Sequence, residues 1–456
     1  MQRVKSAIYS QVVVSYILVS FTSRGYPMKV AKKISFWSAV LMSINIIVGA
    51  GIFFNPQSVT HVAGSFGFLI WPLLGLLLFP VIWSLAQATT VFPGEGGFYN
   101  YCATAFNPTA GFLAHWAYLV GYIGTAATFC AAIKWLLVTQ TNMHMVEDYP
   151  ILVNFLLVLL VSALNMMQLN LVTKLQSGAA LIKMIPLVFV IALAAFYWGP
   201  HLSFNSGDLN NLCSAIGLAI FSFLGFEVCC SISGMIEGGA KKASKAILTA
   251  FFIAMTAYML YHLGLLYIMG VNKLADHGPV AFPQFLGFSS GVTNILQTLI
   301  TFFIFFSVAN ALYGVFLMNV TNLHALAKRN LITGSSALSI VNAYDRPTVA
   351  IAVHGLAVFL LVTFVPSLTV LMALTSTGVC LAFFMTVLAL FSTYYRQKNH
   401  TQLAITALAF CSCAVMIYYG WLEICKDPVS RVVLFVGLVG GFVMYKLHTG
   451  MKAKRK

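Results

Sequence analysis

Charge is scarce in this sequence of 456 residues: only 8% of them are Asp, Glu, Lys or Arg, and only ten are acidic. A soluble protein of this length needs far more charge to cover its surface. A bilayer has the opposite requirement, because lipid tails accept apolar side chains and disfavour charged ones. Since 60% of the residues are hydrophobic, the composition indicates an integral membrane protein without a separate soluble domain.

Motifs of enzymes and of metal sites are also lacking. The ten histidines are scattered, and the sequence contains no HExxH motif, no P-loop and no dinucleotide-binding fingerprint. Most of the nine cysteines lie in apolar segments and none forms a CxxC motif, so they provide neither a metal-binding set nor a disulfide framework. We therefore expect no enzymatic activity, no metal site and no cofactor.

Apolar segments of about twenty residues, the length that crosses a bilayer, recur along the chain. They lie at 36–58, 66–91, 111–138, 151–168, 177–198, 212–236, 246–270, 290–322, 348–365, 367–391, 402–421 and 430–447. The stretch 348–391 is too long for one crossing, so Pro366 is expected to separate two helices. We predict an all-α integral membrane protein of about twelve transmembrane helices, with a transmembrane domain at 34–448 and a basic tail at 449–456.

Basic residues are distributed unevenly between these segments. With twelve spans both termini lie on one side, and only Lys273, Lys426 and Arg431 fall on the other. Lys134 and Lys183 lie within spans, which leaves 20 of the 25 Lys and Arg on the side of the termini. Because loops on the cytoplasmic side carry the excess of Lys and Arg, both termini are expected to be cytoplasmic. The net charge of +15 is thereby explained by the lipid bilayer and not by nucleic acid.

Residues 1–33 are expected to form a cytoplasmic segment of their own. Their apolar run, VVVSYILVSF, is too short to cross a membrane. No small-residue cleavage site follows it, which argues against a signal peptide. The segment could be interfacial, or it could be an upstream extension of a chain whose translation starts at Met28.

Two glycines interrupt the first apolar segment where a helix should be most regular, in Gly49-Ala50-Gly51. Each glycine costs about 1 kcal/mol in a helix interior, so the pair favours a break. A break exposes backbone N–H groups, and the positive end of the following half-helix attracts an anion such as a carboxylate. The alternative is that these small residues only let two helices approach closely.

A matching interruption in the sixth segment favours the first of these interpretations. This segment reads AIFSFLGFEVCCSISG, with Gly225 and the acidic Glu227 near its middle. Paired interruptions at corresponding positions of two halves are typical of transporters built from an inverted repeat, with a binding site at the centre.

The sequence resembles the amino acid–polyamine–organocation permeases, of the bacterial amino acid permease type. The matching pieces follow the order of that family from the first span to the ninth. They are GAGIFFNP at 49–56, FPGEGGFYNY at 92–101, FSFLGFE at 221–227, HALAKRNLI at 324–332 and YDRPTVAIAV at 344–353.

This resemblance implies a LeuT-type fold, with a 5+5 inverted repeat, discontinuous helices 1 and 6, and two extra helices. It also implies alternating access in a cell membrane, the inner membrane of a bacterium, and it allows a homodimer. Amides of Gly49, Ala50 and Gly51 would hold a substrate carboxylate. Carbonyls of Phe221 and Leu224 would face the amino group, with Phe221 also acting as an aromatic gate.

Further positions follow from the same resemblance. Thr125 and Thr128 on the third span would line the cavity. Lys183 on the fifth span resembles a lysine that replaces a sodium ion in proton-coupled members, although it could also be a structural amine that does not titrate. Glu227 could sense protons, contact a cationic substrate, or bond to the broken backbone.

The resemblance does not extend to every feature of the family. Arginine/agmatine exchangers have a tryptophan on the eighth span, where this chain has Val315, with Tyr313 nearby. We therefore predict a secondary transporter that takes up a neutral or weakly polar amino acid with a proton. The alternatives are exchange of an amino acid for its amine, or polyamine transport with Glu227 facing the cation.

Overall fold

The computed structural model describes residues 34–93, 96–141, 143, 145–167, 182–196, 203–227, 230, 236–365 and 367–453, all within one compact unit, Ile34–Lys456. The expected N-terminal segment at 1–33 and the last three residues of the expected tail lie outside the described residues. The final helix, α20, continues to Ala453, past the boundary expected at 448.

Every regular element among the described residues is an α-helix (α) or a 3-10 helix (η). In chain order they are α2 (Phe36–Ile47), α3 (Ala50–Ala63), η2 (Gly64–Leu69), α4 (Ile70–Val91), α5 (Gly97–Ala105), α6 (Pro108–Thr141), α7 (Met145–Asp148), α8 (Pro150–Asn165), α10 (Ile185–Phe196), η3 (Ser206–Ala215), α11 (Ile216–Ala219), η4 (Ile220–Phe223), α13 (Gly239–Met269), α14 (Val271–His277), η6 (Pro279–Phe285), α15 (Ser290–Lys328), α16 (Ser335–Leu338), α17 (Thr348–Phe364), α18 (Leu368–Arg396), α19 (His400–Cys425) and α20 (Pro428–Ala453). The predicted all-helical class is confirmed for this part of the chain.

Seven helical segments of the described chain are long and apolar enough to cross a membrane, and five further apolar helices have 10–17 residues. The expected spans at 36–58 and 212–236 are both interrupted, the first between α2 and α3 and the second after η4. The two helices expected around position 366 are also separate, since α17 ends at Phe364 and α18 begins at Leu368.

Local sequence explains where several of these helices start. Ser35 caps α2, because its Oγ accepts a hydrogen bond from the Ser38 amide at 3.2 Å. Ser367 and Asn399 cap α18 and α19 in the same way. Side chains of this kind satisfy amides that have no partner within their own helix.

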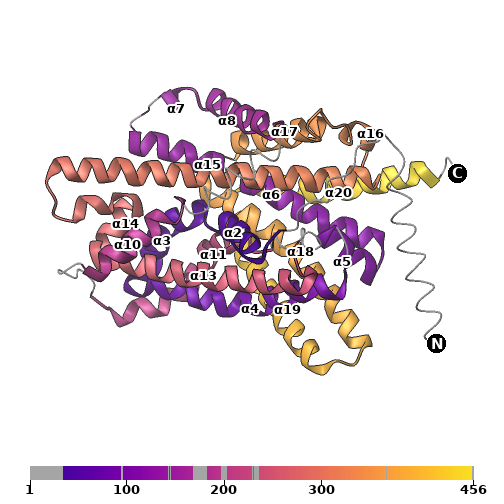
Figure 1. Ribbon diagram of the computed structural model, residues 1–456, viewed down its shortest axis with the longest axis horizontal. Coiled ribbons are helices and arrows are strands. Elements are labelled where there is room, and N and C mark those ends of the chain that lie inside the picture. The colour runs from indigo at the N-terminus through magenta and orange to yellow at the C-terminus, as the bar shows by residue number, and fades with distance from the viewer. Residues whose placement is uncertain are drawn as a thin grey trace. The chain divides into compact units, whose positions relative to one another are not determined.

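The long helices lie side by side around the two interrupted ones. Helix α15 packs against α6, α8 and α17, while α13 packs against α4 and α10. In Figure 1, α8 and α17 lie on one side of α15, and α13 and α4 lie on the other. The short helices α2, α3 and η4 contact α13, α15 and α6, so the breaks lie in the interior of the helix bundle.

Helices α6 and α18 approach each other most closely where two glycines meet. A Cβ atom at Gly378 would lie 2.7 Å from the Cα atom of Gly121, and one at Gly124 would lie 2.8 Å from Oγ1 of Thr375. Such contacts let two backbones come together in a membrane, where dispersion forces between helices replace the hydrophobic effect. Helix α6 is thereby fixed next to the interrupted helices.

We predict that Gly378→Leu separates α6 from α18 and lowers stability by at least the 1–3 kcal/mol typical of overpacking. Thermal unfolding of the purified protein measures the change. Gly440→Leu is the matched control, because a Cβ at Gly440 in α20 has no neighbour within 4 Å. Equal unfolding temperatures for the two variants would contradict this account of the α6–α18 contact.

Candidate substrate-binding site

The first interruption separates α2 from α3 at Val48 and Gly49. Gly49 has φ −127° and ψ −143°, which is not a helical conformation, and its amide bonds to the Ile47 carbonyl at 2.9 Å. No side chain caps the start of α3. The first amides of this 14-residue helix therefore present partial positive charge inside the protein, which suits an anion.

The second interruption follows η4 and touches the first. Leu224 is extended, and Gly225 has φ +115°, a conformation that other residues rarely adopt. A Cβ atom at Gly225 would lie 2.6 Å from Cγ2 of Ile46 and 3.0 Å from the Ile47 amide nitrogen. Only glycine fits here, both for its backbone angle and for the close approach of the two broken segments.

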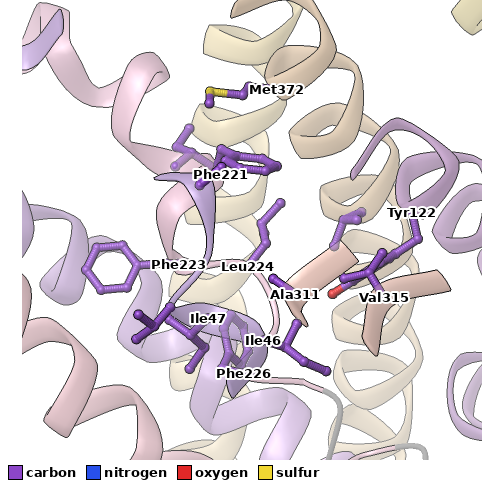
Figure 2. Close-up of a cluster of buried hydrophobic side chains, with 14 of the residues drawn as sticks. Ile46, Ile47, Tyr122, Phe221, Phe223, Leu224, Phe226, Ala311, Val315 and Met372 are labelled. Atoms are coloured by element: carbon purple, nitrogen blue, oxygen red, sulfur yellow. The ribbon is translucent and has the colours of Figure 1, made fainter. Parts of the chain in front are cut away.

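A narrow cavity lies between these two interruptions and α6. Its lining residues are Ile46, Ile47, Gly49, Ala50, Gly51, Tyr122, Thr125, Phe129, Phe221 and Leu224. Figure 2 shows Leu224 at the centre of this region, with Phe221 above it, Ile46 and Ile47 below it, and Tyr122 on the right. The cavity leaves about 10 Å³ for the centres of water molecules, which is room for about one water.

Six of the seven predicted substrate-binding residues line this one cavity. They are Gly49, Ala50, Gly51, Thr125, Phe221 and Leu224. Thr128 is buried but is not among the lining residues, and its Oγ1 donates to the Gly124 carbonyl at 2.8 Å. The Phe221 carbonyl already accepts the Leu224 amide at 3.2 Å, so a substrate amino group would share that oxygen.

Four lining residues were not predicted from the sequence. Ile46 and Ile47 directly precede the break, and Tyr122 and Phe129 lie on α6. Tyr122 and Phe129 could have been proposed from helical spacing, since residues three or four positions from Thr125 lie near it on the helix surface. Phe129 also packs edge-on against Phe221, with ring centroids 6.1 Å apart.

Another aromatic pair, one turn along α3 from Ala50, joins α3 to α6. Phe54 packs edge-on against Trp135 of α6, with ring centroids 5.0 Å apart. Residue Asn55 then joins α3 to the second broken segment, because its Nδ2 donates to the Leu218 carbonyl and to Ser222 Oγ, both at 2.7 Å. Packed rings and these hydrogen bonds thus join α3 both to α6 and to the second broken segment.

Glu227 is fully buried and lies outside the set of lining residues. Its Oε1 accepts hydrogen bonds from the hydroxyls of Tyr122 and Tyr118, and its Oε2 accepts the Gly225 amide at 2.9 Å. Within the described chain no cation pairs with it. Tyr122 therefore has two contacts, since its ring lines the cavity and its hydroxyl binds the carboxyl group.

Lys183 is also fully buried and binds the first interruption from outside the cavity. Its Nζ donates to the carbonyls of Asn45 and Val48, at 2.5 and 2.8 Å. The hydroxyl of Tyr258 donates to the Ile47 carbonyl between them, at 2.8 Å. These donors satisfy carbonyls that lose their helical partners where α2 ends.

Val315, which stands where arginine/agmatine exchangers have a tryptophan, is fully buried on α15. Figure 2 places it beside Tyr122 and Ala311. Tyr313 is also buried on that helix, but neither residue lines the cavity. The cavity is therefore lined by uncharged residues, and its polar side chains are Thr125 and Tyr122.

Comparison with known proteins identifies the family of this chain. Residues 34–444 match the model of a family described as amino acid permease. The chain is 25% identical over 57% of its length to the "Probable agmatine/putrescine antiporter AguD" of Lactococcus lactis. It is 22% identical over 70% of its length to the serine/threonine exchanger SteT of Bacillus subtilis, and 26% identical over 45% to the gamma-aminobutyric acid permease of that organism.

The matched segments cover these relatives to different extents. They span 57% of the antiporter, 74% of the exchanger and 46% of the gamma-aminobutyric acid permease. The family match, in contrast, extends over most of this chain and includes both interruptions. The chain therefore belongs to the amino acid permease family, whose members are transporters and not enzymes.

Proposed function

We propose that this protein carries an amino acid across the cell membrane by alternating access. The observation that supports this most directly is the meeting of two broken helices at one buried cavity. Uncapped amides of α3 face a carboxylate there, and the extended backbone at Leu224 provides acceptors for an amino group. An amino acid needs both kinds of partner at a fixed separation.

The same proposal includes twelve membrane crossings in a LeuT-type arrangement, with five plus five repeated helices and two more at the end. Long and short apolar helices together support that number when the segment Ala50–Val91 is divided into α3 and α4, and α2 and α3 are taken as one broken crossing. The excess of Lys and Arg in alternate connections supports cytoplasmic termini. A cavity with room for about one water supports alternation, because a substrate can enter only when the lining moves.

A neutral amino acid is the favoured substrate. Every lining residue is uncharged, and the space beside the broken backbone is bounded by apolar groups such as Leu224 and Phe129. The similarity to a serine/threonine exchanger points the same way. Charged side chains of a substrate would lie in this cavity without a partner, at a cost of several kcal/mol.

We propose that uptake is coupled to protons through Lys183. A buried lysine changes its protonation readily, and the amine here binds two carbonyls of the broken first span. Release of the proton would weaken those bonds and favour movement of α2. Proton-coupled uptake is tested in proteoliposomes, where an inward pH gradient should drive accumulation of a labelled neutral amino acid.

Exchange of an amino acid for an amine is the second candidate. It is favoured by the similarity to an agmatine/putrescine antiporter and by the presence of Glu227 one side chain away from the cavity. Against it, both oxygens of that carboxyl group are already occupied by neutral donors.

We predict that Gly51→Leu abolishes uptake while the protein still reaches the membrane. Even the Cβ atom would lie 2.7 Å from the Cα of Ser222, and the rest of the side chain would fill the approach to the α3 amides. Uptake at equal expression is the measurement. Gly291→Leu is the control, since a Cβ there meets nothing within 4 Å, and normal uptake by Gly51→Leu would exclude this carboxylate site.

Lys183→Ala should lose accumulation against a gradient but retain exchange when substrate is present on both sides. The physical reason is that the variant has no proton to release, whereas binding of the zwitterion does not use this amine. Lys134→Ala is the control, because that lysine is only partly buried. Wild-type uptake that ignores an imposed pH gradient would argue against proton coupling and favour exchange.

Glu227→Gln separates a neutral from a cationic substrate. Oε1 of glutamine can still accept from the tyrosines. The NH2 of its side-chain amide, however, would face the Gly225 N–H, so that two donors meet, and we expect a loss of about 1–3 kcal/mol in stability. Affinity for a neutral substrate should change little, whereas affinity for a cation paired with Glu227 should fall by about 3–5 kcal/mol. Calorimetric titration measures both, with Glu423→Gln as the control for loss of an acidic group paired with Lys426.

A further inference from the structure

Helices α6 and α15 form a seam that runs from the cavity toward one end of the bundle. The two helices are antiparallel, so residues with higher numbers on α15 contact residues with lower numbers on α6. Tyr118 donates to Met318 Sδ at 3.6 Å, and Asn319 Nδ2 donates to the Leu119 carbonyl at 3.0 Å. His115 Nε2 then bonds to the Asn322 carbonyl at 3.1 Å.

This seam begins at the cavity itself. Tyr122 lines the cavity, and Figure 2 shows Ala311 and Val315 of α15 beside it. His115, Tyr118 and Tyr122 are spaced by three and four residues, which places them on one face of α6. Seven residues of helix from Tyr122 to His115 correspond to about 10 Å. Residues at the far end of the seam therefore lie two helical turns from the substrate.

At the end of the seam away from the cavity, three side chains have polar atoms without a hydrogen-bond partner among the described residues. They are Nδ1 of His115, Oδ1 of Asn319 and Nδ2 of Asn322. All three residues are buried, with 4%, 0% and 7% of their surface exposed. An unpartnered buried polar atom costs about 1–3 kcal/mol, so a ligand or water that bonds to these three atoms would be stabilised there.

The chemistry of these atoms indicates what that ligand is. His115 Nε2 must donate, because its partner is a carbonyl oxygen, and Nδ1 of the neutral ring is then an acceptor. Oδ1 of Asn319 is a second acceptor, and Nδ2 of Asn322 is a donor. Acceptors and a donor together match the ammonium and carboxylate ends of a zwitterion, and the water that accompanies them.

We propose that His115, Asn319 and Asn322 form an inner subsite between the cavity and the cytoplasm. The charged ends of the amino acid, together with the water that accompanies them, contact this subsite. This inference rests on the proposed function for the nature of the substrate and for the orientation of the chain. The cavity selects the side chain with apolar groups. The inner subsite keeps the zwitterion partnered while it passes through the rest of the bundle.

Leucine at Asn319 or Asn322 tests the proposal, because it keeps the branching and the number of side-chain heavy atoms and removes the polar ones. We expect uptake turnover to fall at least about tenfold, while affinity for the neutral amino acid, measured by calorimetry, changes less than about threefold. Asn154→Leu is the matched control, since Asn154 is equally buried and has an unpartnered Oδ1, but lies against α17, away from the seam. Its turnover should stay within about twofold of wild type. Normal turnover in both seam variants, with unfolding temperatures at or above that of wild type, would overturn the inner subsite.

A second measurement does not depend on leucine variants that fold poorly. Asn322→Cys should react with a charged thiol reagent added on the cytoplasmic side, faster than Asn154→Cys and than the wild type with its own cysteines. Equal, slow labelling of both variants would overturn the proposal. A wild-type protein that moves no amino acid would refute the proposed function instead, and labelling at position 322 would still decide whether the seam opens to the cytoplasm.

Discussion

Backbone groups freed by two broken helices are the constraint on which the rest of this structure depends. Inside a membrane protein each unpaired N–H or C=O costs several kcal/mol, so a break persists only where other groups satisfy it. Here the carbonyls of Asn45, Ile47 and Val48 are bound by Lys183 and Tyr258. The α3 amides on the other side of the break have no side-chain cap and face the cavity. The two ends of the break therefore differ, because side chains bind the carbonyls that end α2 whereas no side chain caps the start of α3, and the proposed carboxylate site depends on this difference.

Two buried ionisable groups flank the cavity without entering it. Lys183 binds backbone oxygens, and Glu227 binds two hydroxyls and an amide, so each is held by neutral partners. Neither forms an ion pair within the described residues, although each would attract the other's charge. A direct ion pair would satisfy both charges, whereas the proton coupling proposed for Lys183 requires an amine that can release its proton.

Much of this arrangement could be predicted from the sequence, because the strongest signals were local. Closely spaced glycines marked the break at Gly49, and Gly225 marked the second one. Apolar segment lengths predicted six of the later helices, to within a few residues at most ends, but not the short α14 and α16. The six are α13, α15, α17, α18, α19 and α20. The separation of α17 from α18 followed from a single proline. Backbone preference acts over a few residues, so it leaves a clear trace in the sequence.

What the sequence did not reveal depends on which helix faces meet. Thr128 lies three residues from Thr125 on α6, and both hydroxyls donate to the carbonyl four residues earlier, yet Thr125 lines the cavity and Thr128 does not. Tyr122 was overlooked although it is three residues from Thr125, because its importance arises from Glu227, more than a hundred residues away. The same holds for Asn319 and Asn322, which are ordinary polar residues in an apolar helix until α6 is placed beside them.

Hydrogen bonds between elements indicate which parts can move together when the cavity opens. Asn55 ties α3 to α11 and η4 through two bonds of 2.7 Å, so these segments should move as one body. Helix α6, in contrast, is held against α18 by the contact of Gly121 with Gly378. Packed rings, Phe129 on Phe221 and Phe54 on Trp135, are among the contacts that join the first group to α6. Aromatic contacts are worth about 0.5–1.5 kcal/mol each beyond their buried area and have no fixed donor geometry, so they can separate and re-form more easily than the polar bonds on either side. Alternating access, as proposed above, would require these ring contacts beside the cavity to part and re-form.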